Sequence, residues 1–96
     1  MQTSAVPEEL IKLREQIDSL DEELLNVLSR RFQVTAEVGL LKAEHGLESV
    51  DEAREAKKLR HLQQASAGKN LNPDFVHDLF QMIFAEVVNN HRSYRK

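Results

Sequence analysis

The sequence predicts an all-α fold with three helices per chain, and two observations carry that prediction. Only three glycines and two prolines occur in the 96 residues, and they divide the chain into three stretches with helical periodicity. No stretch shows the alternation of apolar and polar residues that is typical of half-buried strands. We therefore expect residues 1–96 to form a single helical domain, with residues 1–6 disordered at its start.

The first helix is predicted to begin at Pro7 and to run to His45. Proline suits a first helical turn, and the acidic residues Glu8 and Glu9 complement the positive end of the helix dipole. Gly46 follows as a natural C-terminal cap.

The apolar residues of this helix recur with a seven-residue pattern, and we call them the seam: Leu10, Leu13, Ile17, Leu20, Leu24, Val27, Val34, Val38 and Leu41. Nearly forty residues would make a helix roughly 57 Å long, whereas a compact chain of this length has a radius of gyration of about 12.5 Å. The other two helices cannot cover so long a stripe. We expect a second copy to cover it, in an intertwined helical homodimer.

The second helix is predicted to begin at a capping box, Ser49-Val50-Asp51-Glu52, and to end before Gly68. The third is predicted to begin with Asn72 as N-cap and Pro73 in the first turn. Its apolar stripe comprises Phe75, Val76, Leu79, Phe80, Ile83, Val87 and Val88.

Composition excludes several classes of protein. The chain has no cysteine, which excludes disulfides and thiolate metal sites, and its formal charge of −3 lacks the basic footprint of a nucleic-acid binder. No apolar stretch approaches the roughly 20 residues of a membrane helix, and the first seven residues lack the features of a secretion signal. We therefore expect a cytoplasmic protein that binds neither nucleic acid nor membrane.

One seam position is occupied by a cation, Arg31. A buried arginine either forms an ion pair with an acidic residue or binds an anionic ligand. The spacing alone favours an ion pair with a glutamate of a partner helix. Lys42 follows eleven residues later, within roughly 20° of the same helix face and about 16 Å along the axis. The two cations can flank a small dicarboxylate, although a solvated lysine is the simpler explanation of Lys42 alone.

Other charged residues allow two interpretations as well. Arg14 lies about 26 Å from Arg31 along the helix, so both can serve one small ligand only if the partner subunit donates Arg14. Alone, Arg14 is better explained as a surface residue paired with an acid. Asp51, Arg54 and Glu55 share one helix face, either as a solvated ion-pair patch or as a ligand-binding cation with carboxylates that accept from a hydroxyl.

His91 extends the stripe of the third helix, either to complement the helix dipole or to donate a hydrogen bond at a pocket edge. The remaining histidines, His45, His61 and His77, lack the spacing of a metal site, and we expect no metal. The sequence contains no recognisable nucleophile with its base, phosphate-binding loop or pair of catalytic carboxylates.

Several segments, in this order and spacing, resemble the first helix of the all-helical chorismate mutases: Leu13-Arg14-Glu15-Gln16-Ile17-Asp18-Ser19-Leu20-Asp21-Glu22-Glu23-Leu24-Leu25, Arg30-Arg31, Glu37-Val38-Gly39 and Lys42. The resemblance continues through Asp51, Arg54-Glu55 and Leu79-Phe80-Gln81, and so covers most of the chain. The segment Val38-Gly39-Leu40-Leu41-Lys42-Ala43-Glu44-His45-Gly46-Leu47 is similar to the monofunctional enzymes of high-GC Gram-positive bacteria.

This resemblance implies a homodimer with two active sites that rearranges chorismate to prephenate, the branch-point step of the shikimate pathway toward phenylalanine and tyrosine, without a cofactor. It implies that Arg31 and Arg14 of the partner subunit bind the two substrate carboxylates. Lys42 would contact the ether oxygen and a carboxylate, and Arg54 would add to the cationic wall. In related bacteria such enzymes can associate with the first enzyme of the pathway, which adds that enzyme to the expected partners.

The resemblance further implies that Asp51 and Glu55 hold the ring hydroxyl. Two positions depart from the family pattern: His91 stands where glutamine or glutamate donates to the ether oxygen, and Val87 replaces a serine. We expect His91 in the pocket as that donor.

The residue inventory suits this reaction, because a unimolecular pericyclic step needs confinement and oriented donors rather than a nucleophile or a base. Two alternatives stay open on the sequence alone. One is a lyase of the same architecture that eliminates pyruvate from isochorismate, and the other is a non-catalytic helical dimerisation module. The sequence carries no information about feedback regulation.

Overall fold

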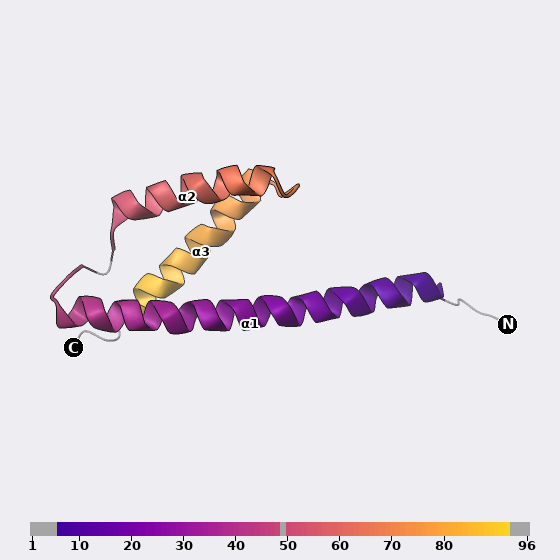
Figure 1. Ribbon diagram of the computed structural model, residues 1–96, viewed down its shortest axis with the longest axis horizontal. Helices are drawn as coiled ribbons and strands as arrows, with labels where there is room; N and C mark the ends of the chain where they lie inside the picture. Colours follow the sequence, from indigo (N-terminus) through magenta and orange to yellow (C-terminus); the bar gives the residue numbers. More distant parts are fainter. Residues whose placement is uncertain (1–5, 49, 93–96) are drawn as a thin grey trace. The chain divides into compact units, whose positions relative to one another are not determined.

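The computed structural model describes residues 6–48 and 50–92 and contains three helices (Figure 1). They are α1 (Glu8–Glu44), α2 (Glu52–Ala67) and α3 (Pro73–Arg92), and no strand occurs among the described residues. The predicted all-α fold of three helices is therefore confirmed. The predicted disorder of the first residues falls, for residues 1–5, outside the described part of the chain.

Local hydrogen bonds explain where α1 begins and ends. The carbonyl of Pro7 accepts from the backbone N–H groups of Leu10 and Ile11, which starts the helix one residue after the predicted position. At the other end Gly46 has a φ of 67°, a conformation that favours glycine. The Leu47 N–H then reaches back to the Lys42 carbonyl at 2.7 Å, which completes a Schellman cap.

The start of α2 differs from the prediction. The N-cap is Asp51, which has an extended backbone and whose side-chain carboxylate accepts the N–H of Arg54 at 3.1 Å. The predicted capping box headed by Ser49 is wrong, because Glu52 is the first residue of the helix rather than its third. Ser49 itself lies outside the described residues. Aspartate and serine are both good N-caps, and both residue types occur in this short segment of the sequence.

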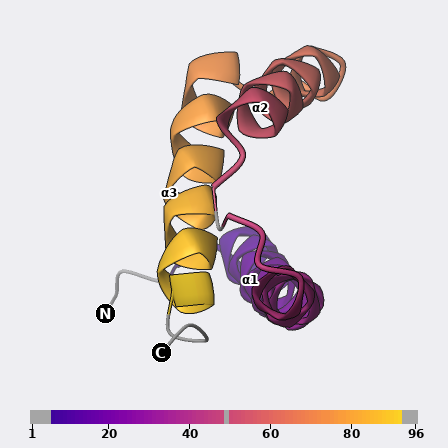
Figure 2. The same cartoon turned by 90° about the vertical axis from the view of Figure 1, so that its left-hand side faces the viewer.

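A tight turn joins α2 to α3. The carbonyl of Ser66 accepts the N–H groups of Lys69 and Leu71, at 3.0 and 3.2 Å, and Asn70 takes a left-handed conformation with a φ of 57°. Asn72 caps α3 as predicted, because its side-chain oxygen accepts the Asp74 N–H at 2.9 Å. Figures 1 and 2 both show α2 and α3 meeting at this turn and diverging from it.

The chain divides into two compact units, one up to Gln33 and one from Val34 onward. In the first unit the seam residues of α1 are exposed. In the second unit Val76 and Ile83 of α3 are buried, and the rings of Phe80 and Phe84 lie 6.1 Å apart. The apolar core of the described chain therefore belongs to the second unit.

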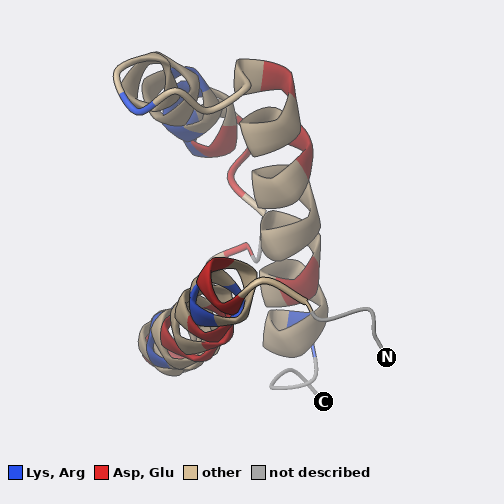
Figure 3. Cartoon of the chain, turned by 90° about the vertical axis from the view of Figure 1, so that its right-hand side faces the viewer, with Lys and Arg blue, Asp and Glu red and all other residues tan. Residues whose placement is uncertain are grey.

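Charge is unevenly distributed over the helices. Figure 3 shows basic and acidic residues interspersed along α1 and α2, whereas α3 is largely uncharged. None of the described helices has an apolar stretch long enough to span a membrane.

Candidate active site

The two arginines predicted to bind carboxylates lie in the first unit. Arg14 is exposed. Arg31 is half-buried, and its Nη1 atom is shielded from solvent. The Arg31 side chain is therefore not fully exposed to solvent. Partial burial of this kind is expected of a cation that binds an anion in a desolvated site.

Lys42 lies in the last turn of α1, in the second unit, and is half-buried. A cation at this position interacts favourably with the negative end of the helix dipole. The backbone of the same residue is held by the Gly46 cap, since its carbonyl accepts the N–H of Leu47. Position and cap together fix the place from which the lysine side chain extends.

The three predicted residues of α2 have different environments. The Asp51 carboxylate serves the backbone of α2 as its N-cap, and it holds the N–H of Arg54 rather than that residue's guanidinium. The Arg54 side chain is exposed, whereas Glu55 is half-buried. Glu55 is the predicted residue of this group that faces a cavity.

That cavity lies between α2 and α3 and has a volume of about 330 Å³. Its walls include Glu55 and Leu59 of α2 and Gln81, Phe84, Val88 and Arg92 of α3. Glu55 is the predicted site residue among them. The spacing of the α3 residues, at i, i+3, i+7 and i+11 from Gln81, places them on one helix face, and this signal could have identified Gln81 and Arg92 from the sequence.

Val87 and His91 directly precede Val88 and Arg92, which line this cavity, but they are not themselves part of its wall. Val87 is half-buried, and His91 is only 4% exposed. The His91 Nε2–H donates to the backbone carbonyl of Thr35, with an Nε2–O distance of 2.8 Å. A ring nitrogen that the sequence analysis reserved for substrate therefore holds the backbone of α1.

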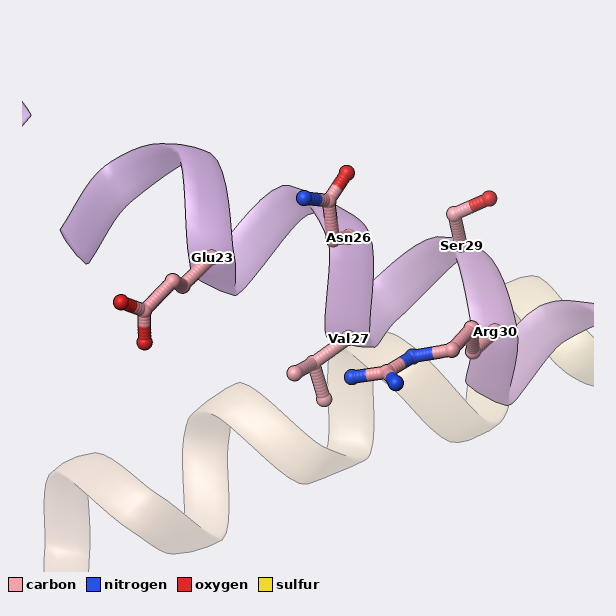
Figure 4. A pocket seen from close by; sticks show the side chains of 5 residues that line it. All are labelled: Glu23, Asn26, Val27, Ser29 and Arg30. Atoms are coloured by element: carbon pink, nitrogen blue, oxygen red, sulfur yellow. The ribbon is translucent and has the colours of Figure 1, made fainter. Parts of the chain in front are cut away.

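A second hollow, of about 450 Å³, lies on α1 in the first unit and involves none of the predicted site residues. Figure 4 shows Val27 between Glu23 and Arg30, with Asn26 and Ser29 pointing to another side of the helix. All five residues belong to one helix, so the hollow is a depression in the surface of α1.

Among residues 6–48 and 50–92, no three or more histidine, cysteine, aspartate or glutamate residues are grouped so that they could hold an ion.

Comparison with known proteins places the chain in a family. The family model described as chorismate mutase type II matches residues 13–92. The chain belongs to the chorismate mutase type II family. The predicted family is thus confirmed.

Two relatives support the assignment. The T-protein of Enterobacter agglomerans is 36% identical over 78 residues, which cover 81% of this chain and 21% of the relative. The T-protein of Haemophilus influenzae is 33% identical over 89 residues, which cover 91% of this chain and 23% of the relative. The chain therefore spans about a fifth of the length of these two relatives, and its resemblance to the monofunctional type stays a prediction.

Proposed function

We propose that this protein rearranges chorismate to prephenate in the cytoplasm, as a step in phenylalanine and tyrosine biosynthesis, without a cofactor. The family match carries this proposal, because residues 13–92 include every residue that the sequence analysis placed in the site, from Arg14 to His91.

The reaction suits the charged groups of the chain. The substrate is a dianion, and breaking its ether bond makes negative charge grow on one oxygen. Arginine recognises carboxylates with paired hydrogen bonds, and a shielded arginine such as Arg31 binds an anion more strongly than one in bulk water. A local group of cations also explains how a chain of net charge −3 can attract a dianion.

Each side chain has a role in this proposal. Arg31 and Arg14 of the partner subunit bind the two carboxylates, Lys42 contacts a carboxylate and the ether oxygen, and Arg54 strengthens the positive potential. The ring hydroxyl is held by Glu55 and Asp51. The half-buried state of Glu55 and its position in a cavity wall support its role, since a carboxylate there can accept a hydrogen bond from a hydroxyl group in a partly desolvated site.

The proposal includes a homodimer. Every seam residue of α1 is exposed in the single chain, and a stripe of this extent on a soluble helix marks an interaction surface. A second copy offers the same heptad pattern, so the two seams are complementary by symmetry. An intertwined pair would also let one chain supply Arg14 to the site of the other.

The decisive assay measures consumption of chorismate and identifies the product. Formation of prephenate supports the proposal. Absence of turnover with chorismate, under conditions in which the chain is folded and dimeric, contradicts it. Release of pyruvate from isochorismate in the same assay series would instead assign the lyase reaction, and inactivity with both substrates would favour the dimerisation module.

Donation of Arg14 across subunits can be tested by mixing Arg14→Ala chains with Arg31→Ala chains. Random exchange gives about half mixed dimers, each with one intact site and one doubly altered site, so about a quarter of the unmodified activity should return. Each variant alone should be nearly inactive. If subunit exchange is verified and no activity returns, Arg14 does not serve the partner's site.

We also propose association with the first enzyme of the shikimate pathway. Addition of that purified enzyme should raise kcat/KM for chorismate, and analytical ultracentrifugation should show a joint complex. Unchanged kinetics and separate sedimentation would contradict this partnership.

A further inference from the structure

His91, near the end of α3, is a buried titratable residue whose hydrogen bond crosses to another helix. Its partner, the carbonyl of Thr35, precedes it by 56 residues. A backbone carbonyl can only accept a hydrogen bond, so Nε2 must carry the hydrogen. The neutral imidazole ring has a single N–H group, and Thr35 uses it. The Nε2–H group that Thr35 binds is therefore not available to the ether oxygen of a substrate.

Gly39 makes this arrangement sterically feasible. A Cβ atom built on Gly39 would lie 2.8 Å from Nε2 and 2.9 Å from Cγ of His91, and closer still to Cδ2. Such distances are well inside van der Waals contact, so any side chain at this position would displace the ring. The imidazole thus occupies the space that a side chain of residue 39 would fill. We call the arrangement of His91, Thr35 and Gly39 the His91 contact.

The His91 contact lies on the face of α1 that also carries Lys42. Thr35, Gly39 and Lys42 are spaced i, i+4 and i+7, which places them in one line along the helix. All three belong to the second unit, together with α3. The contact therefore fixes how the last three turns of α1 are rotated relative to the end of α3, and with them the direction in which Lys42 leaves the helix.

We propose that His91 is a positioning residue, which sets the orientation of Lys42 through the Thr35 carbonyl and the Gly39 surface, and that its Nε2–H is given to Thr35 rather than to the substrate. Its effect on catalysis rests on the proposed function. Its effect on the packing of α1 against α3 does not. This assignment replaces the role of ether-oxygen donor that the sequence analysis gave to His91.

A double-mutant cycle on the full dimeric chain tests the contact without any assay of activity. Gly39→Ala should lower the Tm by about 5 °C or more when His91 is present, because the new methyl group displaces the ring. In the His91→Ala background the same substitution should leave the Tm unchanged or raise it, since alanine is a better helix former than glycine.

Gly68→Ala is the matched control, because a Cβ there meets only the Ala65 carbonyl oxygen, at 3.8 Å. It should have the same small effect in both backgrounds. If Gly39→Ala changes the Tm by the same amount with and without His91, the two residues are not coupled and the proposal is overturned.

Kinetics separate positioning from a purely structural role. Residue 39 is not among the proposed substrate contacts, yet Gly39→Ala should lower kcat about 10-fold with little change in KM, because Lys42 is misaligned in the transition state. His91→Ala should give a similar loss, and the double variant should lose no more than either single variant. Unchanged kcat in a Gly39→Ala protein whose Tm has fallen would overturn the positioning role. Absence of chorismate turnover in the unmodified protein would contradict the proposed function alone, since the Tm cycle still reports on the contact.

A measurement on the unmodified protein covers the case in which variants do not fold. NMR of the imidazole nitrogens should show the Nε2–H form of His91, with a proton that exchanges slowly with solvent. Addition of prephenate should leave this signal and its exchange rate in place. An Nδ1–H tautomer, or a proton lost to rapid exchange, would overturn the proposal.

Discussion

The two units of the chain both carry apolar stripes, but only the stripe of α3 includes buried residues. In α3, Val76 and Ile83 are 5% and 8% exposed. In the first unit, Leu20 and Leu24 of the seam are 59% and 58% exposed. The periodicity of apolar residues shows which face of a helix is apolar. Whether that face is buried depends on which other helices pack against it. The second unit buries part of its α3 stripe within one chain. The seam, which continues into the second unit at Val34, Val38 and Leu41, is exposed and is covered, in our proposal, by a second copy.

The largest expected effect comes from breaking the exposed stripe. Leu20→Lys should dissociate the dimer and lower activity about 100-fold or more, because an unpaired charge in an apolar interface costs about 3–5 kcal/mol. Sedimentation and turnover at several protein concentrations measure both effects. Glu22→Lys adds the same side chain outside the seam and should leave both unchanged. A Leu20→Lys protein that is still dimeric and active would show that the exposed seam is not the surface that a second copy covers.

The cation within the stripe should have the next largest effect. Arg31→Ala is expected to lower kcat/KM about 100- to 1,000-fold while the dimer persists, because it removes a carboxylate ligand that also stabilises the transition state. Steady-state kinetics with light scattering measure this. The neighbouring Arg30 is exposed, and Arg30→Ala should change kcat/KM by less than about 3-fold. Equal losses for both arginines would mean that general charge, rather than the seam position, matters.

The buried stripe should respond through stability. Ile83→Ala removes a buried side chain and should lower the free energy of unfolding by about 2–5 kcal/mol. Ile11→Ala makes the same change at an exposed position outside the seam and should cost less than about 1 kcal/mol. Urea denaturation at fixed protein concentration measures both values. Similar losses at the two sites would show that residue 11 is covered in the assembled protein.

The smallest expected effect concerns the cap of α2, where a structural and a binding role coincide. Asp51→Ala should destabilise the protein by about 1 kcal/mol, whereas Asp51→Asn should be nearly neutral because asparagine is an equally good N-cap. A rise in KM for chorismate in Asp51→Asn, at unchanged Tm, would reveal the binding role. Unchanged KM would limit Asp51 to capping.

Helix boundaries followed from the sequence wherever a single residue carried the signal. Gly46 and Asn72 act as the caps that their types predict, because one backbone conformation or one side-chain oxygen decides the outcome. The start of α2 was misplaced because Ser49 and Asp51 compete for the same role two residues apart. Local chemistry alone does not rank two good caps.

The candidate site was predictable in its charges but not in its contacts. Arg31 was identified because it interrupts an apolar pattern, and that signal lies within one helix. The His91 contact joins residues 56 positions apart. It requires glycine at position 39 because a side chain there would clash with the His91 ring. From the sequence alone, Gly39 is a glycine that weakens a predicted helix. Only the packing of the His91 ring against it shows why a small residue is needed there.

The turn around Asn70 has a consequence for how the protein reaches its final state. Because α2 and α3 are joined by so few residues, this hairpin closes a short loop, and its folding is a first-order process that does not depend on how many chains are present. Covering the seam requires an encounter of two molecules and is second order. At low protein concentration the hairpin should therefore fold before two chains associate. The rate at which complete sites form would then depend on the concentration of newly made chains rather than on the folding rate of each chain.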